Sequence, residues 1–164
     1  MLGQKPPEND AEFEKAYQQR IRKDMLYGVY IPKDLADAFV QLNKRIDSES
    51  KQKFQSVPEE EVSDKLFFSL ARWIMHNWGF HGGSRFSHYI KQLGIYHPED
   101  MARFVIISYH RYLNKKSLNV KDLVNYFHEK QEQEKQKIIQ KGEILHEEKR
   151  VRARPESDRE GGGK

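Results

Sequence analysis

Residues 72–111 read RWIMHNWGFHGGSRFSHYIKQLGIYHPEDMARFVIISYHR, and this stretch contains both tryptophans, five of the seven histidines and the only adjacent glycines outside the C-terminal tail. From Leu66 to Lys116, seven Lys or Arg residues are opposed by two acids, so the block carries a net charge of about +5, whereas the whole chain carries +4. Apolar residues, imidazoles and cations gathered together are what a small binding site requires. The sequence therefore indicates where a site should be sought.

On the N-terminal side of this stretch, apolar residues recur at helical spacing. They predict one helix from residue 10 to residue 25 and a second that starts at Ile31-Pro32. Residues 48–55 are polar and predict a linker. The capping-box pattern at 56–59 predicts the start of a third helix, which Gly79 would end.

Helix signals also follow one another toward the C-terminus. Ser84 and Gly94 bound a short helix, Pro98 starts a longer one, and Asn119 caps the next. Residues 104–107 form a β-prone run, but the Pro98 start and the helical spacing of the apolar residues favour a helix, and the chain has no Asn-Gly hairpin. We therefore predict an all-α fold, a compact bundle of about five to six helices with a protruding C-terminal helix.

Composition separates a central domain from polar ends. The chain of 164 residues is 37% hydrophobic and 33% charged, but its aromatic and aliphatic residues crowd between Tyr27 and Phe127. The predicted division is an N-terminal helical extension over 1–26, a globular helical domain over 27–128, an extended charged helix over 129–150 and a disordered tail over 151–164.

The extended charged helix carries one small apolar cluster. This cluster predicts either a solvated, fraying helix or a helix for self-association or partner binding. Its members are Ile138, Ile139, Ile144 and Leu145.

Several classes of protein can be excluded from composition. The chain has no cysteine, which excludes disulfides, thiolate metal sites and a cysteine nucleophile. Its first ten residues lack the apolar run of a signal peptide, and no apolar stretch approaches the length of a membrane span, so we expect a cytoplasmic protein without membrane contact. A net charge of +4 permits an anionic partner but is small for a dedicated DNA-binding protein.

Five ordered motifs between about residues 27 and 127 resemble one bacterial family. The motifs are YGVYIPKDL at 27–35, WIxxNWG at 73–79, GGSR at 82–85, GIYHPEDM at 94–101 and SYHRYLN at 108–114. That family is an uncharacterised helical domain, a domain of unknown function. The resemblance implies a helical fold and a bacterial origin, and it implies no activity and no catalytic residue.

The turn from Trp78 to Arg85 is the candidate recognition site. Gly82 and Gly83 allow the backbone to take positive φ or to approach a ligand closely. Ser84, Arg85 and the first amides of the next helix are suited to a phosphate or carboxylate group. The alternative is structural, with two glycines that permit a sharp turn and a serine that caps its own helix. The turn lacks the Lys-Ser/Thr of a P-loop.

Arginines and histidines elsewhere can extend this site. Arg72 and Arg111 would converge with Arg85 on one ligand, although Arg111 can instead pair with Asp100 or with helix-end carbonyls. Trp78, Phe80 and His81 would form a partly apolar wall. The full set of predicted ligand-binding residues is Arg72, Trp78, His81, Gly82, Gly83, Ser84, Arg85, His97 and Arg111.

Three functions are compatible with these residues. The first is a non-enzymatic helical binding or interaction module that recognises an anionic group on a protein or a small ligand. The alternative is a small enzyme acting on a phosphate- or carboxylate-bearing substrate, with His81, His97 or His110 as its base. A second alternative is a weak nucleic-acid binder, because cations and aromatic residues are interleaved. No metal, cofactor or catalytic residue is assigned, because the histidines lack metal-motif spacing and no catalytic motif is complete.

Overall fold

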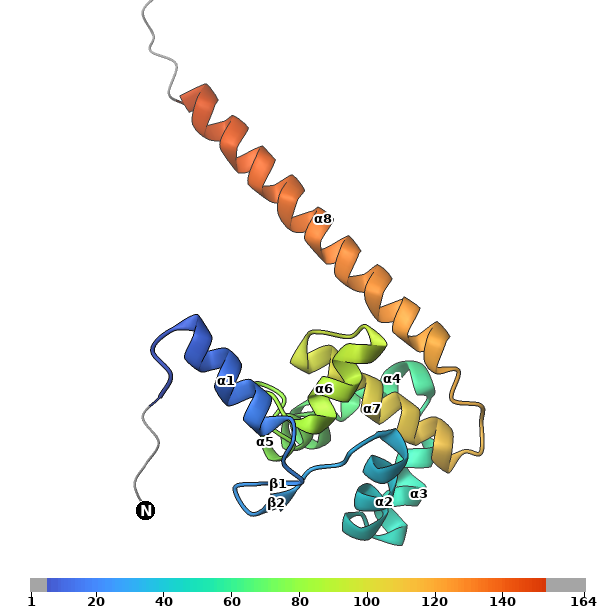
Figure 1. The fold of residues 1–164 in the computed structure, drawn as a ribbon. Helices are drawn as coiled ribbons and strands as arrows, with labels where there is room; N and C mark the ends of the chain where they lie inside the picture. Colours follow the sequence, from blue (N-terminus) through green and yellow to red (C-terminus); the bar gives the residue numbers. More distant parts are fainter. Residues whose placement is uncertain (1–5, 153–164) are drawn as a thin grey trace, which may run out of the picture. The chain divides into compact units, whose positions relative to one another are not determined.

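The computed structural model describes residues 6–152 and confirms a predominantly helical fold (Figure 1). The chain divides into two compact units, with the boundary between Asn125 and Tyr126. The elements of the described residues, in chain order, are α1 (Asp10–Arg20), β1 (Met25–Leu26), β2 (Val29–Tyr30), α2 (Leu35–Arg45), α3 (Ser48–Ser56), α4 (Glu59–Lys65), the π-helix η1 (Phe67–Ala71), α5 (Arg72–Asn77), α6 (Arg85–Leu93), α7 (Pro98–Leu113) and α8 (Val120–Arg152).

Helix α7 is the centre of the first unit (Figure 1, yellow) and packs against α3, α4, η1, α5 and α6. It starts as predicted, with Pro98 in the first turn and acidic residues beside it at the positive end of the helix. Ten of its 16 residues are buried, and the β-prone run at 104–107 lies among them. Burial of each large apolar side chain contributes roughly 1.5–3 kcal/mol, so tertiary packing overrides the local strand preference.

The single helix predicted from residue 56 to Gly79 is interrupted by the π-helix η1. The amide of Ala71 donates to the carbonyl of Leu66, five residues earlier, at 3.0 Å. Val62 in α4 and Ile74 in α5 are both fully buried. One additional residue between them turns both helices toward the same core.

The predicted linker at 48–55 is wrong, because these residues form α3. The Asp47 side chain accepts from the Ser50 amide at 2.8 Å and caps the helix, and Phe54 is its one buried residue. The capping box expected at 56–59 is also absent. The Ser56 hydroxyl donates to the Lys53 carbonyl at 2.7 Å, and α4 begins without a side-chain cap.

A two-stranded hairpin follows α1, which ends at Arg20 and not at residue 25. In this antiparallel pair Met25 is opposite Tyr30, and the turn residues Tyr27 and Gly28 have φ of 50° and 77°. Two positive φ angles are typical of the tight hairpin turn that Asn-Gly usually forms, so Tyr-Gly gave no recognisable signal.

Helix α8 begins at Val120, directly after Asn119, and continues without a break to Arg152. The sixth predicted helix and the extended charged helix are therefore one helix, which also includes Val151 and Arg152 of the predicted tail; the rest of that tail lies outside the described residues. None of the helices between residues 6 and 152 combines the length and apolar character that crossing a membrane requires.

Candidate functional site

The turn between α5 and α6 turns its aromatic residues into the core. Trp78 is fully buried, with its ring centroid 5.6 Å from that of Trp73 and 5.4 Å from that of Phe86. Phe80 is also buried, and its ring lies against Phe86. The expected wall of Trp78 and Phe80 therefore lies behind the turn, where a ligand in solvent does not reach it.

Ser84 caps its own helix, as the structural alternative predicted. Its hydroxyl accepts from the Ser87 amide at 3.2 Å, the Ser87 hydroxyl accepts from the Ser84 amide at 2.8 Å, and Ser84 Oγ donates to the Trp78 carbonyl at 2.6 Å. Ser84 is fully buried. Its hydrogen-bonding groups are thus used within the protein.

Arg85 connects α6 to the segment between β2 and α2. Its Nε donates to the Ile31 carbonyl at 2.8 Å, and its guanidinium lies 5.1 Å from the centroid of the Tyr30 ring. The Tyr30 hydroxyl donates to Asp37 at 2.9 Å. Burial alone would raise the pKa of Asp37, but hydrogen bonds from the Lys33 amide and from Tyr30, with the charge of Arg85, hold that pKa below its usual value.

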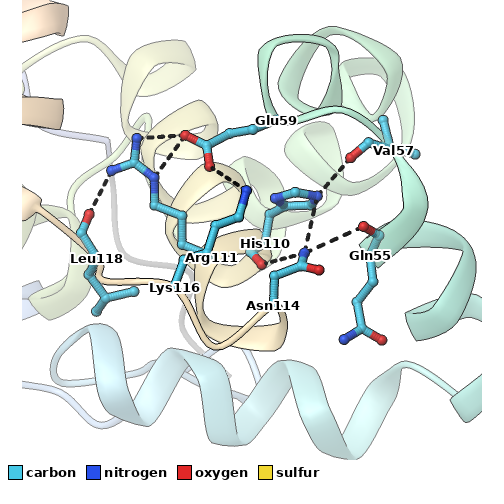
Figure 2. Close-up of polar contacts among 8 residues, drawn as sticks. All are labelled: Gln55, Val57, Glu59, His110, Arg111, Asn114, Lys116 and Leu118. Carbon is cyan, nitrogen blue, oxygen red and sulfur yellow. Dashed lines mark hydrogen bonds and ion pairs between the residues drawn. The ribbon is translucent and has the colours of Figure 1, made fainter.

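Arg111 lies in the last turn of α7, and other groups of the protein accept its hydrogen bonds (Figure 2). Its Nε and Nη2 donate to one oxygen of Glu59 at 2.9 and 2.6 Å, and its Nη1 donates to the Leu118 carbonyl at 2.7 Å. The acid that pairs with Arg111 is therefore Glu59, on α4. Because Arg85 and Arg111 bind different segments of the protein, they do not share one ligand site.

The histidines proposed as bases have different surroundings. His110 is buried, and its Nε2 lies 2.8 Å from the Val57 carbonyl (Figure 2). His97 precedes α7 and is exposed, and its side chain makes no capping hydrogen bond. Arg72 is exposed on α5. His81 is also exposed, and it is the one of these residues that lines a described cleft.

This cleft has a volume of about 500 Å³. It lies between the end of α1, the hairpin, α5 and the turn of residues 78–84 that joins α5 to α6, which we call the glycine turn. Its lining residues are Arg20, Leu26, Tyr27, Val29, Met75, His76, Asn77, Gly79, His81 and Gly82. A second cleft of about 540 Å³ shares Arg20, Leu26, Tyr27 and Gly82 with it.

Arg20 is the cation of this site, and sequence reasoning missed it. Its Nε donates to the Gly83 carbonyl at 2.7 Å, and its Nη1 donates to the Tyr27 hydroxyl at 3.2 Å. A Cβ atom at Gly82 would lie 2.9 Å from Nη2, so the missing side chain makes room for the guanidinium. Within residues 6–152, no carboxylate forms an ion pair with Arg20.

The cleft can donate hydrogen bonds and positive charge to a ligand. Arg20 supplies a guanidinium, His76 and His81 supply exposed imidazoles, and Tyr27 supplies an exposed phenol. The Asn77 amide nitrogen donates to the Trp73 carbonyl at 2.9 Å, which fixes the orientation of that side chain. In the described part of the chain, no group of three His, Cys, Asp or Glu residues is arranged to hold a metal ion.

Comparison with protein-family models identifies a family for this chain. A family model described as a domain of unknown function (DUF6794) matches residues 31–113, which are 83 of the 164 residues. No curated protein and no solved structure matches the chain significantly. The matched range includes His76, His81 and Gly82 of the cleft, whereas Arg20 and Tyr27 precede it. The chain therefore belongs to the family described as a domain of unknown function, DUF6794.

Proposed function

We propose that the protein is a non-enzymatic binding module that recognises an anionic group in the cleft beside the glycine turn. The observation that carries this proposal is the guanidinium of Arg20, which lies in the cleft without a carboxylate partner among the described residues. The predicted anion site at the Trp78–Arg85 turn is thereby restricted to the half of the turn that faces the cleft.

The geometry of Arg20 favours binding of phosphate or carboxylate. Two of its nitrogens are held by Gly83 and Tyr27, so the guanidinium loses little freedom when a ligand arrives. Within residues 6–152, Nη2 and the second N–H of Nη1 make no described hydrogen bond, so they can donate charge-assisted bonds, which are roughly twice as strong as neutral ones. The volume of about 500 Å³ lies within the range of small-molecule sites. A small anion or an acidic group on a protein partner would both fit this chemistry.

Titration of ¹⁵N-labelled protein tests the proposal, with inorganic phosphate and acetate as separate probes. We expect shifts at His81, Gly82 and the Arg20 side chain, and about a tenfold weaker affinity in the Arg20→Gln variant, which corresponds to the loss of one charge-assisted hydrogen bond. Arg22→Gln is the matched control, because Arg22 is exposed and does not line the cleft.

Two outcomes would overturn the assignment. Shifts that appear elsewhere on the domain would mean that the site is misplaced. Equal weakening in Arg20→Gln and Arg22→Gln would mean that the probes sense only the general positive charge. Preference for one of the two probes would identify the ligand group as phosphoryl or carboxyl.

We further propose that α8 mediates self-association through its apolar cluster. The four side chains of this cluster are 52–70% exposed, which is unusual for isoleucine and leucine. Ile138 and Leu145 are seven residues apart and therefore lie on the same side of the helix, as in a coiled-coil seam. We also propose, as the sequence predicts, that the protein is cytoplasmic.

Sedimentation velocity over a range of concentrations tests self-association through α8. The wild-type mass should rise with concentration, and the double variant Ile138→Asp, Leu145→Asp should remain monomeric. The control is Gln136→Asp, Gln140→Asp, which adds the same charge at exposed polar positions of the same helix. A wild-type protein that is monomeric at every concentration would refute the proposal.

A further inference from the structure

Helix α1 is held on the domain by very few side chains. None of its residues is fully buried, and Ala16, Tyr17 and Arg20 are the partly buried ones, so apolar packing contributes little to its position. The side-chain hydrogen bonds that join α1 to later segments, within residues 6–152, come from Tyr17 and Arg20. Because Arg20 is the cation of the cleft, the position of α1 determines whether the cleft is complete.

Tyr17 packs against the glycine turn and the helix α6 that follows it. Its hydroxyl and His88 Nδ1 are 2.9 Å apart and share a hydrogen bond, and the two rings meet edge to face. The Lys91 ammonium lies 5.0 Å from the centroid of the Tyr17 ring. Burial, and to a lesser degree Glu14, raises the pKa of Tyr17, so its hydroxyl keeps its proton at neutral pH.

Gly83 leaves the space that the Tyr17 ring occupies. A Cβ atom at Gly83 would lie 2.5 Å from two ring carbons of Tyr17, which is far inside van der Waals contact. The carbonyl of the same glycine accepts the hydrogen bond from Arg20 Nε. Tyr17 and Arg20 thus both contact Gly83, and they do so from one face of α1, because residues three apart lie on the same face of a helix.

We infer that Tyr17 and His88 are positioning residues, which dock α1 on the glycine turn and thereby place Arg20 in the anion-binding cleft. Tyr17 does not line the cleft of about 500 Å³ but lines the second cleft of about 540 Å³, so its effect on the first cleft is exerted through Arg20. This inference rests on the proposed function for its effect on binding. Ligand binding and docking of α1 are then coupled, and each stabilises the other by the same free energy.

The Tyr17→Phe variant tests this inference, because it removes the hydroxyl and keeps the ring. Phosphate affinity should fall about three- to tenfold, as expected for one lost hydrogen bond transmitted to the site. Tyr126→Phe is the matched control, because Tyr126 is exposed on α8 and its hydroxyl makes no described hydrogen bond. His88→Asn, whose amide can replace the ring nitrogen Nδ1, should retain more affinity than His88→Leu.

A double-variant comparison separates positioning from a general loss of structure. In an Arg20→Gln background, Tyr17→Phe should have no further effect on phosphate affinity, because the residue that it positions is gone. A further loss of similar size in that background would overturn the inference.

Hydrogen exchange of the Arg20 Nε–H group with solvent is a second test of the positioning role, and it needs no ligand. The hydrogen bond to the Gly83 carbonyl should slow this exchange in the wild type, and Tyr17→Phe should accelerate it several-fold. If wild-type protein binds neither phosphate nor acetate but this acceleration occurs, the proposed function fails and the positioning role holds. Unchanged exchange in Tyr17→Phe would refute the positioning role.

Discussion

The ion pair between Glu59 and Arg111 should make the stability of the domain depend on pH (Figure 2). Glu59 is the first residue of α4 and Arg111 lies in the last turn of α7, so the pair joins α4 to the central helix of the unit. The Glu59 side chain is 26% exposed and that of Arg111 is 18% exposed. The informative perturbation is Glu59→Gln, which keeps the shape and removes the charge.

The size of the effect follows from the contacts. Arg111 donates two hydrogen bonds to one oxygen of Glu59, at 2.9 and 2.6 Å. A hydrogen bond to a charged group contributes about 1.5–3 kcal/mol, against about 1 kcal/mol for a neutral one. The two bonds share an acceptor and are not additive. We therefore expect Glu59→Gln to lower the free energy of unfolding by about 1–2 kcal/mol at neutral pH.

The pH dependence has a definite sign. Hydrogen bonds from Arg111 hold the pKa of Glu59 below its usual value despite the opposing effect of partial burial. The unfolded chain keeps the usual value, about 4.3, so the carboxylate stabilises the fold fully above that pH. As pH falls below it and through the folded pKa, this stabilisation disappears. The difference between wild type and Glu59→Gln should shrink accordingly.

Urea unfolding at a series of pH values measures this difference. Glu60→Gln is the matched control, because Glu60 is the exposed neighbour and forms no described ion pair. Its difference from wild type should stay below about 1 kcal/mol, because only the interaction of Glu60 with the positive end of α4 is lost. A Glu59→Gln difference that is the same at pH 7 and at acid pH would show that the charge of Glu59 contributes nothing, and the reasoning would be wrong.

Two further substitutions test the glycine turn. Gly83→Ala, at φ +90°, should cost about 1–3 kcal/mol of backbone strain. It should also displace Tyr17, so hydrogen exchange in α1 should become faster. Gly28→Ala is the control: at φ +77° with nothing within 4 Å, it should show the strain without faster exchange in α1. Ser84→Ala should lower the free energy of unfolding by about 1–3 kcal/mol, because α6 loses its cap and the Trp78 carbonyl loses its donor; a value near zero in urea unfolding would contradict this.

Local signals allowed the second half of the domain to be predicted well. Ser84 and Gly94 bound α6, and Pro98 starts α7, as the sequence indicates. Each of these residues acts within its own turn of backbone, through a cap, a left-handed glycine or a fixed φ. Such effects need no knowledge of the tertiary fold.

The features that were missed depend on distant contacts or on single residues. Helix α3 has one buried anchor, Phe54, and its polar composition concealed the helix. His81 and Gly82 of the predicted turn line the cleft, but the cation of the site was sought in Arg85, whose partners are Ile31 and Tyr30. The contact of Arg20 with Gly83 joins residues 63 apart in the chain, and no local pattern reports it.

The π-helix has a consequence for how the domain tolerates changes in length. Each residue of an α-helix advances the helix by about 100°, so deletion of one residue from Phe67–Ala71 would rotate α5 by that angle relative to α4. Trp78 would then leave the position that it fills between its aromatic neighbours. The number of residues in this segment is therefore fixed by the relative rotation of the two helices that it joins.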